Sequence, residues 1–68
     1  MEHDTERKKP SLREESREHT RQRMLEAAYK LFVEVGYEHT TMEMIAREAE
    51  VGRATLFKYF PGKEKLIL

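Results

Sequence analysis

The sequence predicts an all-α fold, a bundle of three helices followed by the start of a fourth helix. Apolar residues recur at helical spacing in one long segment and in two short segments. Only Glu-Val-Gly separates the two short segments, which is too short for a domain linker and too abrupt for one continuous helix. The 68 residues allow one domain at most.

The first helix is predicted over about residues 20–35. From Met24 to Val35, apolar residues follow the spacing i, i+1, i+4, i+7, i+8 and i+11, which marks one face of an α-helix. Gly36 comes directly after the last apolar residue and suits the left-handed position that ends a helix.

A second helix of about two turns is predicted to follow. Thr40, with Glu43 three residues later, has the capping-box pattern, and Thr41 is an alternative N-cap. A helix this short cannot stand alone and must pack on the first one. Its apolar side lies at the spacing i, i+3, i+4 and i+7, at Met42, Ile45, Ala46 and Ala49.

The third helix is predicted to start near Gly52, with Leu56 and Phe60 as its core contacts. Pro61 and the following glycine end it.

Residues 62–68 have the pattern of the first turns of a fourth helix, with Gly62 as its N-cap. The chain then finishes on the apolar residues 66–68. We expect it to be a fragment whose missing part packs on them.

The N-terminal part is expected to be a flexible charged arm, residues 1–19, in front of a folded domain over residues 20–68. Residues 1–10 are polar and aperiodic, as disordered segments are. Ser11 with Glu14 also has the capping-box pattern, so the first helix could extend back to residue 12. Its arginines would then form one basic stripe, and arms of this kind can reach into the minor groove of DNA. The glutamates between them favour a segment that is only solvated. The stripe consists of Arg13, Arg17 and Arg21.

Composition excludes several classes of protein. The chain has no Cys, which excludes disulfide scaffolds and thiolate zinc sites and fits the reducing cytoplasm. No apolar run approaches the ~20 residues of a membrane span, and the charged N-terminus does not resemble a signal peptide. His3, His19 and His39 share no metal-ligand spacing. Neither a nucleophile with a matching base nor a phosphate loop is evident, so we expect no enzyme, cofactor or metal.

The net charge of zero conceals an asymmetry along the chain. Residues 24–50 carry two Lys or Arg against six Glu, whereas residues 51–68 carry four Lys or Arg against one Glu. An anionic partner would therefore be drawn to the third helix and the residues just after it.

Two short helices joined by a tight turn form a helix-turn-helix, whose second helix enters the major groove of DNA. Breaking the helix makes the second piece protrude. Arginine and threonine can contact base edges there, and lysine can neutralise a phosphate. The side chains expected to point outward or sideways are Arg53, Ala54, Thr55, Phe57, Lys58 and Tyr59.

At residues 20–68 the chain resembles the N-terminal DNA-binding domain of tetracycline-repressor (TetR) family regulators. The resemblance rests on the co-linear motifs T-R-Q-R-x-L-E-A-A-x-x-L-F-x-E-x-G-Y-E-x-T-T-M-x-x-I-A-x-E-A and V-G-R-A-T-L-F-K-Y-F-P-G-K-E-x-L. It implies a bacterial cytoplasmic regulator, usually a repressor. Such a regulator acts as a homodimer on a palindromic double-stranded operator, and its effector-binding and dimerisation domain is absent here. The fragment alone is expected to be a monomer.

The resemblance also implies roles for single residues. Arg53 and Thr55 would contact bases, with Ala54 against the floor of the groove. Thr41, Lys58, Tyr59 and Lys63 would contact phosphates, and Phe57 replaces the usual Tyr and lacks its hydroxyl.

Two further departures from the family pattern concern the turn. Glu50 replaces a turn Gly, so a non-glycine residue would have to accept a positive φ. Gly52 replaces a Ser, which weakens the cap of the third helix.

The alternative is a small helical protein-interaction module without DNA binding. It would dock through residues 66–68 and the Leu25/Phe32 face. The two hypotheses differ in salt response, because phosphate binding releases counterions and apolar docking does not.

Overall fold

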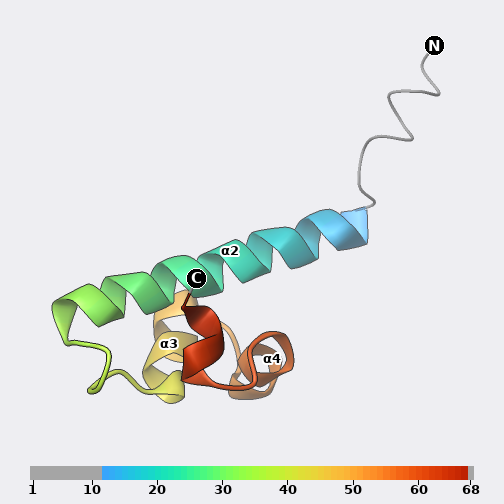
Figure 1. Cartoon of the computed structure of the whole chain (residues 1–68). Coiled ribbons are helices and arrows are strands. Elements are labelled where there is room, and N and C mark those ends of the chain that lie inside the picture. Colours follow the sequence, from blue (N-terminus) through green and yellow to red (C-terminus); the bar gives the residue numbers. More distant parts are fainter. Residues whose placement is uncertain (1–11, 68) are drawn as a thin grey trace, which may run out of the picture.

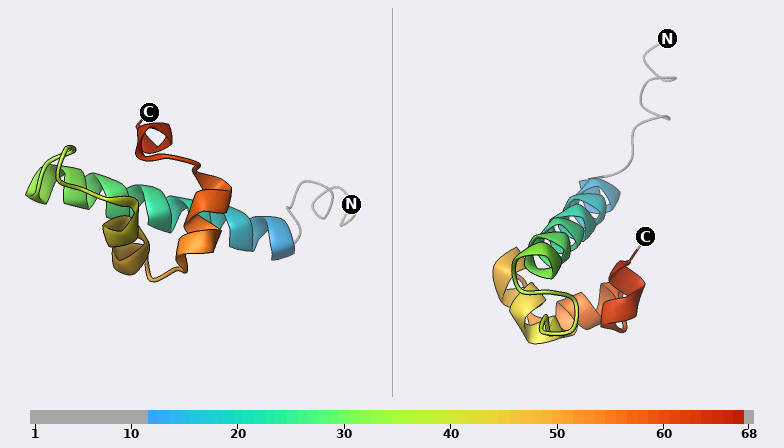
Figure 2. Two further views of the ribbon diagram at one scale, coloured as in Figure 1. Left: turned by 90° about the horizontal axis from the view of Figure 1, so that it is seen from below. Right: turned by 60° about the vertical axis from the view of Figure 1, so that its left-hand side comes forward.

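A computed structural model describes residues 12–67 of the chain, with side chains from Ser16 onward. Within this range it contains only helices and confirms the all-α prediction. The helices are α2 (Leu12–Glu34), α3 (Met42–Ala49) and α4 (Arg53–Tyr59), followed by the 3₁₀ turn η1 (Lys63–Leu66). α3, α4 and η1 all lie on one side of the long helix α2 (Figures 1 and 2). The disorder expected for residues 1–10 concerns a segment outside the described residues.

Residues 12–19, which belong to the arm predicted over residues 1–19, form the first turns of α2, so the first helix extends back to residue 12 as the capping-box pattern allowed. Once a helix is nucleated, each further residue adds a backbone hydrogen bond at little cost, and Leu, Arg and Glu are good helix formers. The N-terminal end of α2 projects beyond the helices that pack against the rest of it (Figure 1).

The core lies where α2 crosses the other helices. Ala28 of α2 and Ala46 and Ala49 of α3 are buried there, and their small side chains let the helices approach closely. Leu56 is the buried residue of α4. The buried apolar residues are Met24, Leu25, Ala27, Ala28, Leu31, Ile45, Ala46, Ala49, Leu56, Phe60 and Leu66. This set confirms the core positions predicted for Leu56 and Phe60, and it contains every residue of the two earlier predicted faces except Phe32, Val35 and Met42.

The apolar stripe of α2 is longer than the surface that covers it. Phe32 is only partly buried, and its ring packs on Tyr37 with 5.1 Å between centroids. Val35, the last residue of the predicted stripe, is exposed. The predicted stripe therefore overestimates burial at the C-terminal end of α2.

The two threonines in the loop between α2 and α3 have different structural roles. Thr41, the alternative in the prediction, is the N-cap, and its Oγ1 accepts a hydrogen bond from the Met44 N–H at 3.1 Å. The capping-box prediction for Thr40 is wrong, because Thr40 is buried and its hydroxyl donates to the Gly36 carbonyl at 2.7 Å. Gly36 has φ 93°, the left-handed conformation predicted for the end of the first helix.

The predicted fourth helix is a 3₁₀ turn within the described residues. Gly62 is its N-cap, as expected, and its carbonyl accepts from the Lys65 N–H at 3.0 Å, an i to i+3 bond. Short pieces favour this tighter form because few α-type bonds would compensate for fixing the backbone. Leu66 is fully buried against the bundle, whereas Ile67 is exposed.

Candidate nucleic-acid interface

The outward face of α4 is the candidate interface. Leu56 anchors the helix in the core, and all its other residues are exposed except Tyr59, which is half-buried. Phe57 is 43% exposed, so its ring is accessible to a partner. The six side chains predicted to point outward or sideways, Arg53, Ala54, Thr55, Phe57, Lys58 and Tyr59, are therefore available on one short helix.

The turn in front of α4 is held in a strained backbone conformation. Glu50 adopts φ 60° and ψ 46°, the positive φ expected where it replaces a glycine. Its N–H donates to the Arg47 carbonyl, and the Val51 N–H donates to the Ala46 carbonyl at 2.9 Å. These bonds satisfy the last carbonyls of α3 and turn the chain abruptly toward α4.

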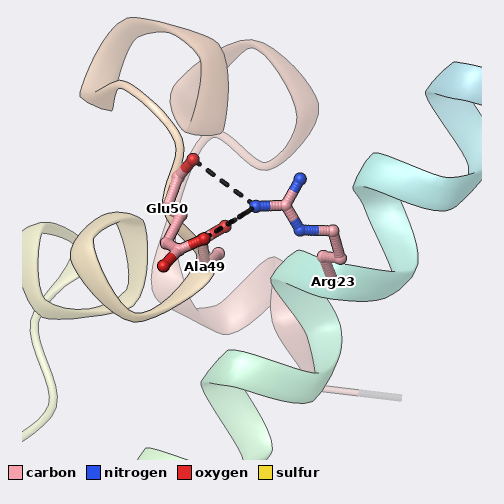
Figure 3. A network of polar contacts seen from close by, with 3 residues as sticks. All are labelled: Arg23, Ala49 and Glu50. Carbon is pink, nitrogen blue, oxygen red and sulfur yellow. Dashed lines mark hydrogen bonds and ion pairs between the residues drawn. The ribbon is translucent and has the colours of Figure 1, made fainter.

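Arg23 of α2 fixes the same turn from outside (Figure 3). Its guanidinium donates to the carbonyl of Ala49 and, at 3.5 Å, to the carbonyl of Glu50. The Glu50 carboxylate lies 3.9 Å from the same guanidinium. A cation at the C-terminal end of α3 also complements the partial negative charge there. Arg23 thus ties the helix-turn-helix to α2, a role that the sequence did not reveal.

Arg53 stands at the first residue of α4 and contacts α3. Its Nη1 lies 2.5 Å from the Oε2 of Glu43, in the first turn of α3, and both side chains are about 60% exposed. The N-cap before Arg53 is Gly52, which makes no side-chain cap hydrogen bond, as expected from the replaced serine. The ion pair therefore links the N-terminal ends of the two helices on the exposed side of the molecule.

Lys63 lies apart from α4 and is bound within the fold. Its Nζ donates to the carbonyls of Tyr37, at 2.7 Å, and Thr40, at 2.9 Å, and lies 4.3 Å from the centre of the Tyr37 ring. An ammonium has three N–H groups, so one hydrogen remains for another acceptor. These bonds place the charge beside Thr41, the N-cap of α3.

A further charged pair links α2 and α3 away from this surface. Lys30 Nζ lies 2.8 Å from Glu48 Oε2, and this hydrogen bond, with the charge of Glu48, raises the pKa of Lys30. Among residues 16–67, no group of three or more His, Cys, Asp or Glu side chains could hold a metal ion. None of the described helices is long and apolar enough to cross a membrane.

Comparisons with known proteins agree with this geometry. Residues 24–68 match the family described as bacterial regulatory proteins, tetR family. The chain is 42% identical over 59 residues to the HTH-type transcriptional regulator TcmR of Streptomyces glaucescens, covering 87% of this chain and 26% of that protein. It is 46% identical over 43 residues to the uncharacterized HTH-type transcriptional regulator YhgD of Bacillus subtilis, covering 63% and 22%.

A third relative is the HTH-type transcriptional regulator SAUSA300_2515 of Staphylococcus aureus, 42% identical over 55 residues, covering 81% of this chain and 29% of that protein. The chain thus spans about a quarter of the length of these relatives. Because the family match covers more than half of its residues, the chain belongs to the tetR family of bacterial regulatory proteins.

Proposed function

We propose that residues 20–68 are the DNA-binding domain of a transcriptional repressor and that α4 is its recognition helix. The observation that carries the proposal is the shape of α4, a helix with one buried residue and an exposed face of cationic, hydroxyl and aromatic side chains. A helix buried on one narrow side and set off by a tight turn can enter the major groove. The relatives of this chain are named as transcriptional regulators, which are not enzymes, and we assign no catalysis to the chain.

The base contacts are assigned to the first turn of α4. The guanidinium of Arg53 can pair in a fork with the O6 and N7 of guanine, and Thr55 can hydrogen-bond to a base edge. Ala54 is small enough to lie against the floor of the groove, and Phe57 offers apolar contact to sugar carbons or a thymine methyl. All four side chains are exposed in the free protein.

The phosphate contacts are assigned to the edges of the same surface. Lys58 and Tyr59 lie in the last turn of α4, where the helix would leave the base edges and meet the backbone. Thr41 is the N-cap of α3, and the Lys63 ammonium, which donates to the carbonyl of the neighbouring Thr40, has one further hydrogen to donate to a phosphate. Phosphate contacts of this kind set orientation and affinity rather than sequence preference.

The whole protein is proposed to act in the cytoplasm as a homodimer on a palindromic operator. Two copies of α4 would then bind half-sites about one helical turn of DNA apart, ~34–36 Å, or a multiple of it. The dimer interface would come from the part of the protein that the relatives have beyond this length. This chain alone is proposed to be a monomer.

The test compares two variants in a dimeric form, either the full-length protein or this chain fused to a dimerising coiled coil. Arg53→Ala should cost ~1–3 kcal/mol on each cognate half-site and relax preference at one base position there. Lys58→Ala should weaken binding on every sequence and reduce the slope of log K against log[salt] by about one for each protomer.

Two outcomes would contradict the proposal. If Lys58→Ala altered sequence preference while Arg53→Ala did not, the orientation of α4 would be wrong. If neither variant changed DNA binding, α4 would not be the recognition helix. The alternative of a protein-interaction module is not supported by the fold, because Leu25 and Leu66, two of its proposed docking residues, are buried in the core.

A further inference from the structure

A groove separates the N-terminal half of α2 from α4. It has a volume of about 610 Å³ and is lined by Arg17 from α2 and by Thr55, Lys58 and Tyr59 from α4. The three α4 residues are spaced i, i+3 and i+4 and therefore share one face of the helix. Figure 2, in the view from below, shows α4 crossing beside this half of α2. The groove exists because α2 begins at Leu12 rather than near residue 20.

A smaller pocket of about 350 Å³ adjoins the groove. It is lined by Arg17, Glu18, Arg21 and Tyr59, so the two cavities share Arg17 and Tyr59. Glu18, the carboxylate at this rim, lies 3.7 Å from Arg21. The Arg21 guanidinium also lies 5.9 Å from the centre of the Phe60 ring, so its charge already interacts with Glu18 and with this ring. Among side chains from residue 16 onward, no carboxylate pairs with Arg17 or Lys58.

The lining has the chemistry of an anion site. Arg17 and Lys58 supply two positive charges from opposite walls, and the hydroxyls of Thr55 and Tyr59 are additional donors. Hydrogen bonds from ionised donors to a phosphate are roughly twice as strong as neutral ones. Pockets for small organic ligands are lined mostly by apolar side chains, whereas the described side chains that line this groove, from Ser16 onward, include no aliphatic one.

The position of the groove favours the DNA backbone as the occupant over a free anion. Lys58 and Tyr59, which line the groove, are also the α4 residues assigned to phosphates in the last turn of the recognition helix. Each strand of duplex DNA carries one phosphate for every ~3.4 Å of helix axis, so backbone bound at Lys58 would pass the mouth of the groove. Arg17, on the facing wall, would then meet the same strand.

We propose that Arg17 and Lys58 together bind a backbone phosphate of the operator in this groove, so that α2 adds a contact outside the helix-turn-helix. This inference rests on the proposed DNA-binding function. The contact is independent of base sequence because it involves only the phosphate. The first turns of α2 thereby act as part of the interface rather than as a merely solvated segment.

The experiment measures binding of the 68-residue chain to a mixed-sequence duplex of ~20 base pairs by fluorescence anisotropy over a range of NaCl concentrations. A mixed sequence is sufficient because phosphate contacts do not depend on the bases. Arg17→Gln should reduce the slope of log K against log[salt] by about one, as expected for the loss of one phosphate contact. Since Arg17 is exposed on the helix surface, its replacement should leave the thermal unfolding transition unchanged.

Lys30→Gln is the matched control. It removes one positive charge from the same helix, 13 residues further along and therefore ~20 Å away. That distance is about two Debye lengths at 0.1 M salt, so a change in overall charge would be screened. Lys30→Gln should retain the parent slope. An equal loss of slope in Arg17→Gln and Lys30→Gln would overturn the proposal, because the effect would then come from overall charge.

Two further outcomes separate this inference from the function on which it rests. If Lys58→Gln reduced the slope and Arg17→Gln did not, DNA binding would stand and the groove would not hold a phosphate. If the parent chain showed no salt-dependent binding to the duplex, the proposed function itself would fail. Inorganic phosphate is titrated separately against the chain, with the Arg17 and Lys58 side-chain NMR signals as the readout. Binding of inorganic phosphate as tight as binding of the duplex would also overturn the proposal, by identifying a free-anion site.

Discussion

Replacing Leu56 by alanine is expected to unfold most of the domain, whereas the same change at its neighbour Phe57 should leave the fold in place. Leu56 is 0% exposed and is the buried residue of α4. Losing a buried leucine side chain typically costs ~2–5 kcal/mol, from lost transfer free energy and the cavity left behind. At ~0.05–0.15 kcal/mol per residue, a domain of this size has a total stability of roughly 3–10 kcal/mol. Leu56→Ala therefore removes a large fraction of it, about half at the midpoints of the two ranges.

Phe57 lies one residue further along the same helix and makes the matched control. It is 43% exposed, so its truncation loses only part of the ~1.5–3 kcal/mol that full burial of a Phe contributes and opens no closed cavity. We expect a loss of ~1 kcal/mol. Phe57→Ala should nevertheless weaken DNA binding, because its exposed ring belongs to the proposed contact surface.

Urea unfolding followed by far-UV circular dichroism measures both effects. Leu56→Ala should lack a folded baseline or show a midpoint far below the parent, and Phe57→Ala should remain close to the parent with the same slope. Equal midpoints for the two variants would refute the reasoning, because α4 would then not be anchored through Leu56. Its assigned outward face would be wrong as well.

Three further predictions concern the caps and the charged pair. Thr41→Ala should lower stability by ~1 kcal/mol in urea unfolding by removing the N-cap of α3, and Thr41→Ser should not. Glu50→Gly should raise the melting temperature slightly. Removing the strain of the left-handed backbone should stabilise the folded state by ~1–2 kcal/mol. The greater freedom of glycine in the unfolded chain costs ~0.4–1 kcal/mol, and loss of the exposed ion pair with Arg23 costs little. A lower melting temperature would contradict this. Because Glu48 raises the pKa of Lys30 above its ordinary 10.5, the stabilisation from this pair is present below pH ~10.5 and is lost as pH rises through the higher folded-state pKa. Glu48→Gln should lower that pKa in an NMR titration of the Lys30 side chain.

The parts of the fold that follow from local patterns were predictable from the sequence. Met24, Ile45 and Leu56 are buried because helical spacing alone determines which face a residue shares. Gly36 and Glu50 adopt positive φ at the positions where the chain must leave a helix. The sequence does not determine where α2 begins, because residues 12–19 have no apolar face and are stabilised only by continuation from the packed part of the helix.

Contacts between distant residues were not predictable in the same way. Arg23 reaches Ala49, which is 26 residues away, and nothing in the spacing of either residue indicates the pair. The choice between Thr40 and Thr41 also depends on how the loop closes, because both carry the same hydroxyl. Such contacts depend on the angle between helices, which periodicity does not specify.

The pair between Glu43 and Arg53 shows how one of these unpredicted contacts could serve the proposed function. An exposed ion pair contributes ~0–1 kcal/mol, whereas a bidentate contact between arginine and guanine is worth ~1–3 kcal/mol of discrimination. Glu43 is therefore too weak a partner to keep Arg53 from a base. A free arginine side chain has ~2 kcal/mol of rotamer entropy to lose, and the bond to Glu43 restricts it before DNA arrives. In the proposed complex this restriction lowers the ordering cost of binding, so Glu43 acts by presenting Arg53 to the groove.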